Sequence, residues 1–203
     1  DEFLGTWQVV STLVAVDVPM GEEMLNDARA VQRAKATLNQ ALTYEQRFVL
    51  GSTGKVIADR PFNVDALTTA TLGGRKLIES VDWDADNPNT MRIRIKDSPE
   101  IYSRVTKRFQ DDHPETKKLE TSEVVEQVFP DREGRAPKVK GSRCLTKYKW
   151  RTAEEAKGGP AIVATQVVSD FVTAFDGADR VFEAQGRPAV VYTYRMSFQK
   201  SSA

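Results

Sequence analysis

Residues 1–12 read DEFLGTWQVVST, and this stretch decides the fold that we expect. Directly after Gly5-Thr6-Trp7, apolar and β-branched residues continue with a period of two as far as Val16. Trp7 and Val9 fall on one side of such a segment and Val10 on the other, because successive side chains of a strand point to opposite faces. This pattern is typical of a β-strand, here apolar on nearly both faces.

Further alternating segments follow, separated by turns rich in Gly, Pro, Asn and Asp. In one of them, Met91, Ile93 and Ile95 alternate with basic residues, as in a half-buried antiparallel strand. Strands are predicted at residues 41–50, 54–59, 76–84, 90–97, 100–110, 119–129, 142–151, 161–175 and 188–198. We therefore expect a mainly β fold, an antiparallel barrel of eight to ten strands that occupies residues 1–203 as a single domain.

One or two short helices complete this prediction. Residues 22–42 place apolar side chains such as Met24, Val31 and Leu38 at helical spacing. This helix either lies across a barrel opening or binds a partner. Residues 60–74 look like a loop with one helical turn, which Gly73 and Gly74 would stop.

The composition excludes several classes of protein. The chain has 203 residues, of which 40% are hydrophobic, and its 29 basic residues balance 29 acidic ones. A net charge of zero gives no general attraction to nucleic acid or to an anionic membrane. Each apolar run is only a few residues long, whereas roughly 20 are needed to span a bilayer. We expect neither nucleic-acid binding nor membrane spanning.

Residues for catalysis or metal binding are scarce. Cys144 is the only cysteine, so an internal disulfide is excluded, and it falls in an alternating strand. His113 is the only histidine, in the polar run 111–118 that we expect to be a loop, so no Ser-His-Asp arrangement is indicated. A metal site near His113 would need converging ligands that a loop rarely supplies. The sequence predicts no catalytic residue, no metal and no cofactor.

The segment ADRPFN, residues 58–63, is the strongest local candidate. Asp59 is expected to cap the turn that follows it, and Arg60 to reach a carboxylate or a carbonyl elsewhere. Pro61 fixes its own φ, and Asn63 can act as a helix N-cap. These roles are structural; the alternative is that Arg60 and Asn63 recognise a partner.

A second candidate is the basic stretch 138–151. Lys147, Lys149 and Arg151 share one face of a predicted strand, and Tyr148 and Trp150 share the other. The interleaved aromatic residues would also suit single-stranded nucleic acid, which the neutral net charge disfavours. Two alternatives stay open: an outward face in solvent, or a basic patch that docks on an acidic protein surface.

The Gly-x-Trp start, Gly5 to Trp7, resembles the signature of lipocalins and the wider calycin barrels. Gly5 permits a tight turn into the barrel, and Trp7 can plug its closed end. The resemblance also implies that a basic side chain of the last strand packs on the indole as a cation–π pair. Arg195 stands at a suitable place in the sequence for this role.

A wider resemblance covers most of the chain. The Gly5-Thr6-Trp7 start, Arg47-Phe48 in a following strand, and then residues 58–63 resemble, in this order, an uncharacterised family of cyanobacteria, algae and plant chloroplasts. The resemblance implies a protein of the thylakoid lumen, cut from a transit peptide near residue 1. The absence of an initial methionine is expected of a processed or trimmed chain. The family carries no assigned catalytic activity.

Three functions follow, in order of preference. The first is a non-enzymatic lumenal auxiliary protein that docks on subunits of a photosystem, with photosystem II during assembly or repair as the first choice. The second is a lipocalin-like carrier of a lipophilic ligand such as a pigment, a lipid or a quinone. The third is an enzyme that uses a calycin-type cavity.

Overall fold

The computed structural model describes residues 2–131 and 136–201, and its main feature is one sheet of ten antiparallel strands. The strands are β1 (Gly5–Asp17), β2 (Ala41–Leu50), β3 (Val56–Ala58), β4 (Ile78–Trp83), β5 (Thr90–Ile95), β6 (Ile101–His113), β7 (Lys118–Phe129), β8 (Lys138–Trp150), β9 (Ile162–Phe171) and β10 (Val190–Lys200). The helices are α1 (Ala28–Ala36), α2 (Arg60–Thr71), α3 (Ala153–Ala156) and α4 (Ala178–Ala184), with 3₁₀ turns η1 (Glu22–Met24), η2 (Pro114–Thr116) and η3 (Ala174–Asp176). The predicted mainly β, antiparallel fold is confirmed.

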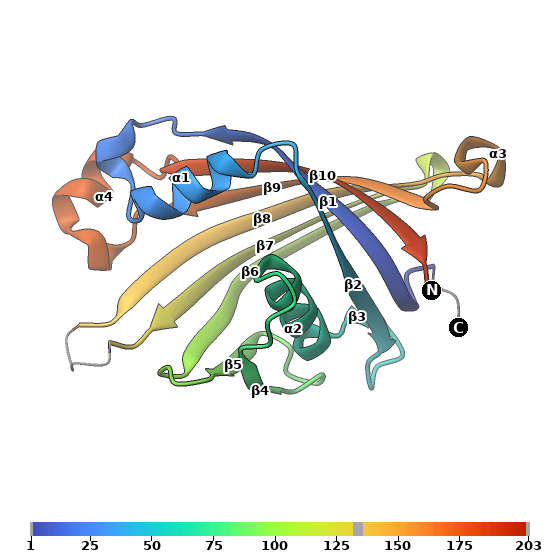
Figure 1. The fold of residues 1–203 in the computed structure, drawn as a ribbon, viewed down its shortest axis with the longest axis horizontal. Helices are drawn as coiled ribbons and strands as arrows, with labels where there is room; N and C mark the ends of the chain where they lie inside the picture. The colour runs from blue at the N-terminus through green and yellow to red at the C-terminus, as the bar shows by residue number, and fades with distance from the viewer. Residues whose placement is uncertain (1, 132–135, 202–203) are drawn as a thin grey trace.

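The sheet is an open, curled half-barrel. Its strand order is β3-β2-β1-β10-β9-β8-β7-β6-β5-β4, so the first strand pairs with the last and the free edges are β3 and β4. Within the described residues no ladder joins these two edges, so the antiparallel barrel that the sequence predicts is open between β3 and β4. Figure 1 shows the curvature of the sheet and, inside it, helix α2 between β2 and β5.

Helix α2 connects the two free edges. It follows β3 directly, contacts β2 and β4, and occupies the concave side that pairing of β3 with β4 would otherwise close. Asp59 is its N-cap, because the Asp59 carboxylate accepts a hydrogen bond from the Phe62 N–H at 3.2 Å. Gly73 and Gly74 end it with φ values of 64° and 92°. The sequence indicated only one turn here, since this helix has no strongly apolar stripe.

The hydrophobic core lies on the concave side of β1, β2, β8, β9 and β10. Its buried members come from the alternate positions that face inward: Trp7, Val9, Tyr44, Ile162, Ala164, Met196 and Phe198. Phe3, Phe48, Tyr148 and Trp150 pack against this cluster, with ring centroids of Phe3 and Trp150 4.8 Å apart. Ala70 of α2 also contacts the cluster, so the helix belongs to the same core.

Three local predictions were wrong. The helix expected over residues 22–42 is only α1, preceded by η1, because Asp27 caps a new start at Ala28. The polar segment 111–113 is not a loop but the end of β6, paired with β7. Helix α4 was not expected at all, since seven residues give too little periodicity to recognise.

Candidate functional site

The Gly-x-Trp start has the structural role that was expected of it, but with a different cation. Gly5 adopts a φ of 111°, and Trp7 is 3% exposed with its indole N–H donating to the Phe3 carbonyl at 2.6 Å. Lys200 Nζ lies 5.5 Å from the centre of the Trp7 ring. Arg195 is opposite Thr12 on the other face of the sheet, so its expected contact with the indole is wrong. Lys200 pairs directly with Trp7 across β1 and β10 and takes this place.

This correction leads to a prediction. Lys200→Gln is expected to lower the free energy of unfolding by about 0.5–1 kcal/mol, because it removes a cation–π contact at an exposed site. Arg195→Gln is the matched control and should change it by less than about 0.5 kcal/mol, since Arg195 is exposed and has no hydrogen bond or ion pair with the described residues. Urea denaturation followed by tryptophan fluorescence compares the two. A larger loss of unfolding free energy for Arg195→Gln than for Lys200→Gln would indicate that Arg195, not Lys200, contacts the indole of Trp7.

The segment at residues 58–63 forms an anchor between α2 and β2. The Asn63 side-chain oxygen accepts from the Arg47 N–H at 2.7 Å, and its amide nitrogen donates to the Arg47 carbonyl at 3.1 Å. The Arg47 guanidinium lies 2.7 Å from Asp59 and covers the Phe62 ring at 4.2 Å. The Asn63 side chain therefore bonds the backbone of Arg47 as a neighbouring strand would. Asn63 is not the N-cap of α2, because Asp59 has that role.

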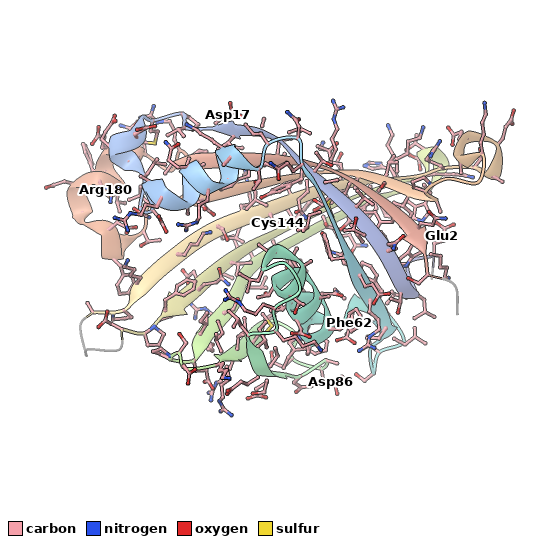
Figure 2. The ribbon with its side chains drawn as sticks, viewed as in Figure 1. Glu2, Asp17, Phe62, Asp86, Cys144 and Arg180 are labelled. Carbon is pink, nitrogen blue, oxygen red and sulfur yellow. The ribbon has the colours of Figure 1, made fainter. Side chains whose placement is uncertain are left out.

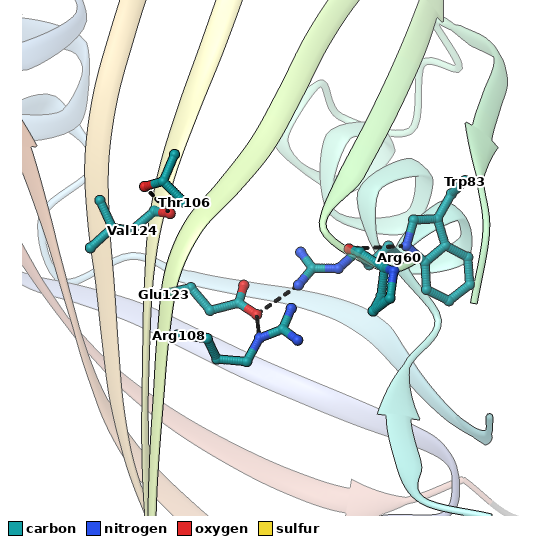
Figure 3. A network of polar contacts seen from close by, with 7 residues as sticks. Arg60, Trp83, Thr106, Arg108, Glu123 and Val124 are labelled. Carbon is teal, nitrogen blue, oxygen red and sulfur yellow. Dashed lines mark hydrogen bonds and ion pairs between the residues drawn. The ribbon is translucent and has the colours of Figure 1, made fainter. Parts of the chain in front are cut away.

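Arg60 links the N-terminus of α2 to β7. Its guanidinium lies 2.7 Å from Glu123 Oε1, and the same oxygen accepts from Arg108 of β6 at 2.9 Å (Figure 3). Burial alone would raise the pKa of Glu123, but the charges and hydrogen bonds of the two arginines outweigh it and lower that pKa. The expectation that Arg60 reaches a carboxylate is thus confirmed, and Glu123 and Arg108, which the sequence did not single out, complete the network.

The wall of the half-barrel beside this network is polar. Gln166 donates to Thr146 at 3.1 Å, and Asp170 lies 3.0 Å from Lys140. Burial raises the pKa of the Cys144 thiol, and it raises the pKa of Tyr44 to about 12. A thiol with a raised pKa stays protonated near neutral pH, whereas a nucleophilic cysteine needs a lowered one. Figure 2 shows Cys144 on this inner wall.

Burial also raises the pKa of Asp170, despite the nearby ammonium of Lys140. One of its carboxylate oxygens, Oδ1, is buried and has no hydrogen-bond partner among residues 2–131 and 136–201. The inner wall therefore holds hydroxyl, amide and carboxyl groups among its apolar side chains, whereas a lipophilic ligand prefers a predominantly apolar lining.

The basic strand has the predicted orientation for Lys147 and Lys149, whereas Arg151 lies beyond its end. Lys147 and Lys149 are exposed on the convex side of β8, while Tyr148 and Trp150 pack against the core. The two lysines have acidic partners, Glu120 at 2.8 Å and Glu155 at 3.3 Å. Arg151 follows the end of the strand and donates to the carbonyls of Pro160 and Glu155.

An exposed apolar tip is the feature that the sequence did not reveal. Phe175 of η3 is 65% exposed and Phe182 of α4, which contacts η3, is 81% exposed; Val181, the chain neighbour of Phe182, is 39% exposed. The apolar tip is tied to η1 and the start of α1, because Asn26 donates to Asp176 at 3.1 Å and Arg180 to the Glu23 carbonyl at 3.5 Å. Figure 1 places α1 and α4 together at one end of the molecule. Two phenylalanines seven positions apart are the one sequence signal for it.

A family model described as "Domain of unknown function (DUF6816)" matches residues 1–202. The chain belongs to the DUF6816 family. No curated protein and no solved structure matches it. This assignment confirms the predicted membership of an uncharacterised family, and the origin in cyanobacteria and chloroplasts stays a prediction.

Two further findings on this DUF6816 chain concern membrane-spanning helices and metal ligands. No helix in residues 2–131 or 136–201 combines the length and the apolar character needed to cross a membrane. In the same ranges, no three His, Cys, Asp or Glu side chains are placed to hold one metal ion. His113 contacts Asp111 at 3.1 Å and lies 3.8 Å from Glu115.

Proposed function

We propose that this chain is a non-enzymatic auxiliary protein of the thylakoid lumen that docks on a photosystem complex. Photosystem II during assembly or repair is the first candidate partner. The compartment and the partner rest on the sequence resemblance carried by Gly5-Thr6-Trp7, Arg47-Phe48 and residues 58–63. The docking role rests on the structure of the exposed surface.

The observation that carries the docking role is the apolar tip formed by Phe175, Val181 and Phe182. Phenylalanine side chains that are 65% and 81% exposed lose contact with water only when another molecule covers them. Exposed apolar patches of this kind mark interaction sites. The bonds from Asn26 and Arg180 hold the tip against α1 and η1, so little ordering is required when a partner binds.

The interior of the half-barrel favours this role over the carrier function. One end of the half-barrel, where β1 begins and β10 ends, is filled by Phe3, Phe48, Tyr148, Trp150 and Phe198. Beyond them, the wall around Gln166, Thr146 and Asp170 is polar. A pigment, lipid or quinone would leave these polar groups unpaired, which costs free energy.

The test is recovery of photosystem subunits by the tagged chain from gently solubilised thylakoid membranes, quantified by mass spectrometry. Wild type should enrich photosystem II core subunits. Phe175→Ser/Phe182→Ser should lower that recovery about tenfold or more, because aromatic anchors dominate interface energies. Phe109→Ser is the matched control, since Phe109 is 57% exposed on β6, away from the tip. Equal recovery with all three proteins would contradict docking through the tip.

A further inference from the structure

A shallow basic saddle lies on the convex face of the sheet, on the opposite side from the core. Its pocket has a volume of about 320 Å³ and is lined by Lys147 and Lys149 of β8, Val163 and Thr165 of β9, and Arg195 of β10, together with Ala164 and Met196. The last two residues are members of the core, so they reach this pocket only through their backbone. The exposed polar side chains that line the pocket are therefore three cations and the hydroxyl of Thr165.

Strand register creates the saddle. Arg195 is opposite Thr165, and Thr165 is opposite Lys147, so a small hydroxyl lies between two long cations in one row across three strands. Neighbouring strands are about 4.8 Å apart, which places the backbones of Arg195 and Lys147 roughly 10 Å from each other. Lys149 is two positions along β8 from Lys147, a step of about 6.8 Å on the same face.

The charges of the saddle are incompletely balanced. Glu120 and Glu155 neutralise Lys147 and Lys149 from outside the pocket. Arg195 is exposed and makes no hydrogen bond or ion pair with any residue of the described ranges. Three cations and two carboxylates leave one positive charge, located on the guanidinium, which is the group best suited to bind a carboxylate with two parallel hydrogen bonds.

The geometry points to the saddle as a binding site for an extended acidic segment of a partner protein. In an extended chain, alternate side chains project on one side about 6.8 Å apart, and this step matches Lys147 and Lys149. Such carboxylates would take over the lysines from Glu120 and Glu155. The carboxylate near Lys147 would lie above Thr165, where the Arg195 guanidinium of the same row can also reach it. A single phosphate, whose oxygens span only a few ångströms, matches one cation of this row at a time. This inference rests on the proposed docking function and adds the chemistry of its partner.

The test uses fluorescence anisotropy of a labelled nine-residue peptide in which glutamate alternates with threonine. Wild type should bind this peptide at about 0.05 M salt, should not bind its glutamine analogue, and should lose binding at about 0.5 M salt. Arg195→Gln should weaken binding about three- to fivefold, the effect of one exposed charge pair. Lys147→Gln/Lys149→Gln should abolish it, because it removes the two cations whose spacing matches the alternate carboxylates of the peptide.

Arg92→Gln is the matched control, since Arg92 is exposed on β5 far along the sheet from the saddle. It should bind the peptide as wild type does. No binding by wild type, or equal weakening by Arg92→Gln and Arg195→Gln, would overturn the inference. Vesicles of anionic phosphatidylglycerol are the alternative probe. If the vesicles bind in a manner that depends on Arg195 and the peptide does not bind, the partner of the saddle is a membrane surface and not an acidic protein segment.

The outcomes separate this inference from the proposed function. If the Arg195→Gln chain recovers photosystem subunits as well as wild type and the peptide does not bind, the saddle is refuted while docking stands. If the peptide binds as expected and no photosystem subunit is recovered, the saddle stands while docking on a photosystem fails.

Discussion

Phe198→Ala is expected to reduce the free energy of unfolding by about 3–5 kcal/mol. Phe198 is completely buried on β10, in the cluster where β1, β9 and β10 meet the aromatic side chains of β8. Its ring lies 5.9 Å from that of Tyr148. Alanine would leave a cavity that Trp7, Ile162 and Met196 cannot fill without moving, so most of the lost packing stays lost.

Equilibrium denaturation in urea measures this loss. Phe109→Ala removes the same ring from an exposed position and should cost less than about 0.5 kcal/mol. A loss below about 1 kcal/mol for Phe198→Ala would mean that the cluster around Phe198 is not the core of the half-barrel.

Glu123→Gln is the second large effect, with an expected loss of about 1–3 kcal/mol at pH 7. The substitution leaves Arg60 and Arg108 without their carboxylate, and removing one partner of a buried ion pair is costly. The full cost does not apply, because the Glu123 side chain is 28% exposed and that of Arg108 is 42% exposed. The N-terminus of α2 should loosen first, since Arg60 is its tie to β7.

The pH dependence identifies this mechanism. The pKa of Glu123 is lowered in the folded chain, so its ion pairs stabilise fully above the unfolded value of about 4.3 and lose this effect as the pH falls through the folded pKa. The difference between wild type and Glu123→Gln should therefore shrink on acidification below about pH 4. Glu126→Gln is the control. Glu126 lies on β7 like Glu123, but its ion pair with Arg104 of β6 is exposed, so its loss should cost less than about 0.5 kcal/mol. A difference that does not change with pH would exclude the charge of Glu123 as its cause.

Strands such as β1, β5 and β10 could be predicted from the sequence because alternate residues of each are buried. Alternation such as that of Met91 and Ile93 on β5 is sufficient to place a strand, and both residues are buried. Whether the sheet closes depends on the pairing of β3 with β4, which are far apart in sequence and carry no local signal of it. The full length of helix α2 was not predicted for a related reason. The helix has no strong apolar stripe, and polar contacts of Arg60 and Asn63 with distant residues hold it in place.

The candidate sites divide in the same way. The outward direction of Lys147 and Lys149 follows from strand period alone, and the sequence was sufficient for it. The partners of Arg60 and of Trp7 depend on register between distant strands: Glu123 is 63 positions from Arg60, and Lys200 lies at the far end of the chain from Trp7. The apolar tip was missed because an exposed Phe182 has the same sequence pattern as a buried one.

Native size fractionation of gently lysed thylakoid membranes, with the endogenous protein followed by antibody, tests the docking claim most directly. We predict that a substantial share of the protein migrates with a photosystem II subcomplex, and that substitution of Phe175 and Phe182 by serine shifts it to the size of the free 22.7 kDa chain. Migration with photosystem I would keep the docking role and change the partner. Recovery of the wild-type protein only as a free monomer would contradict the account.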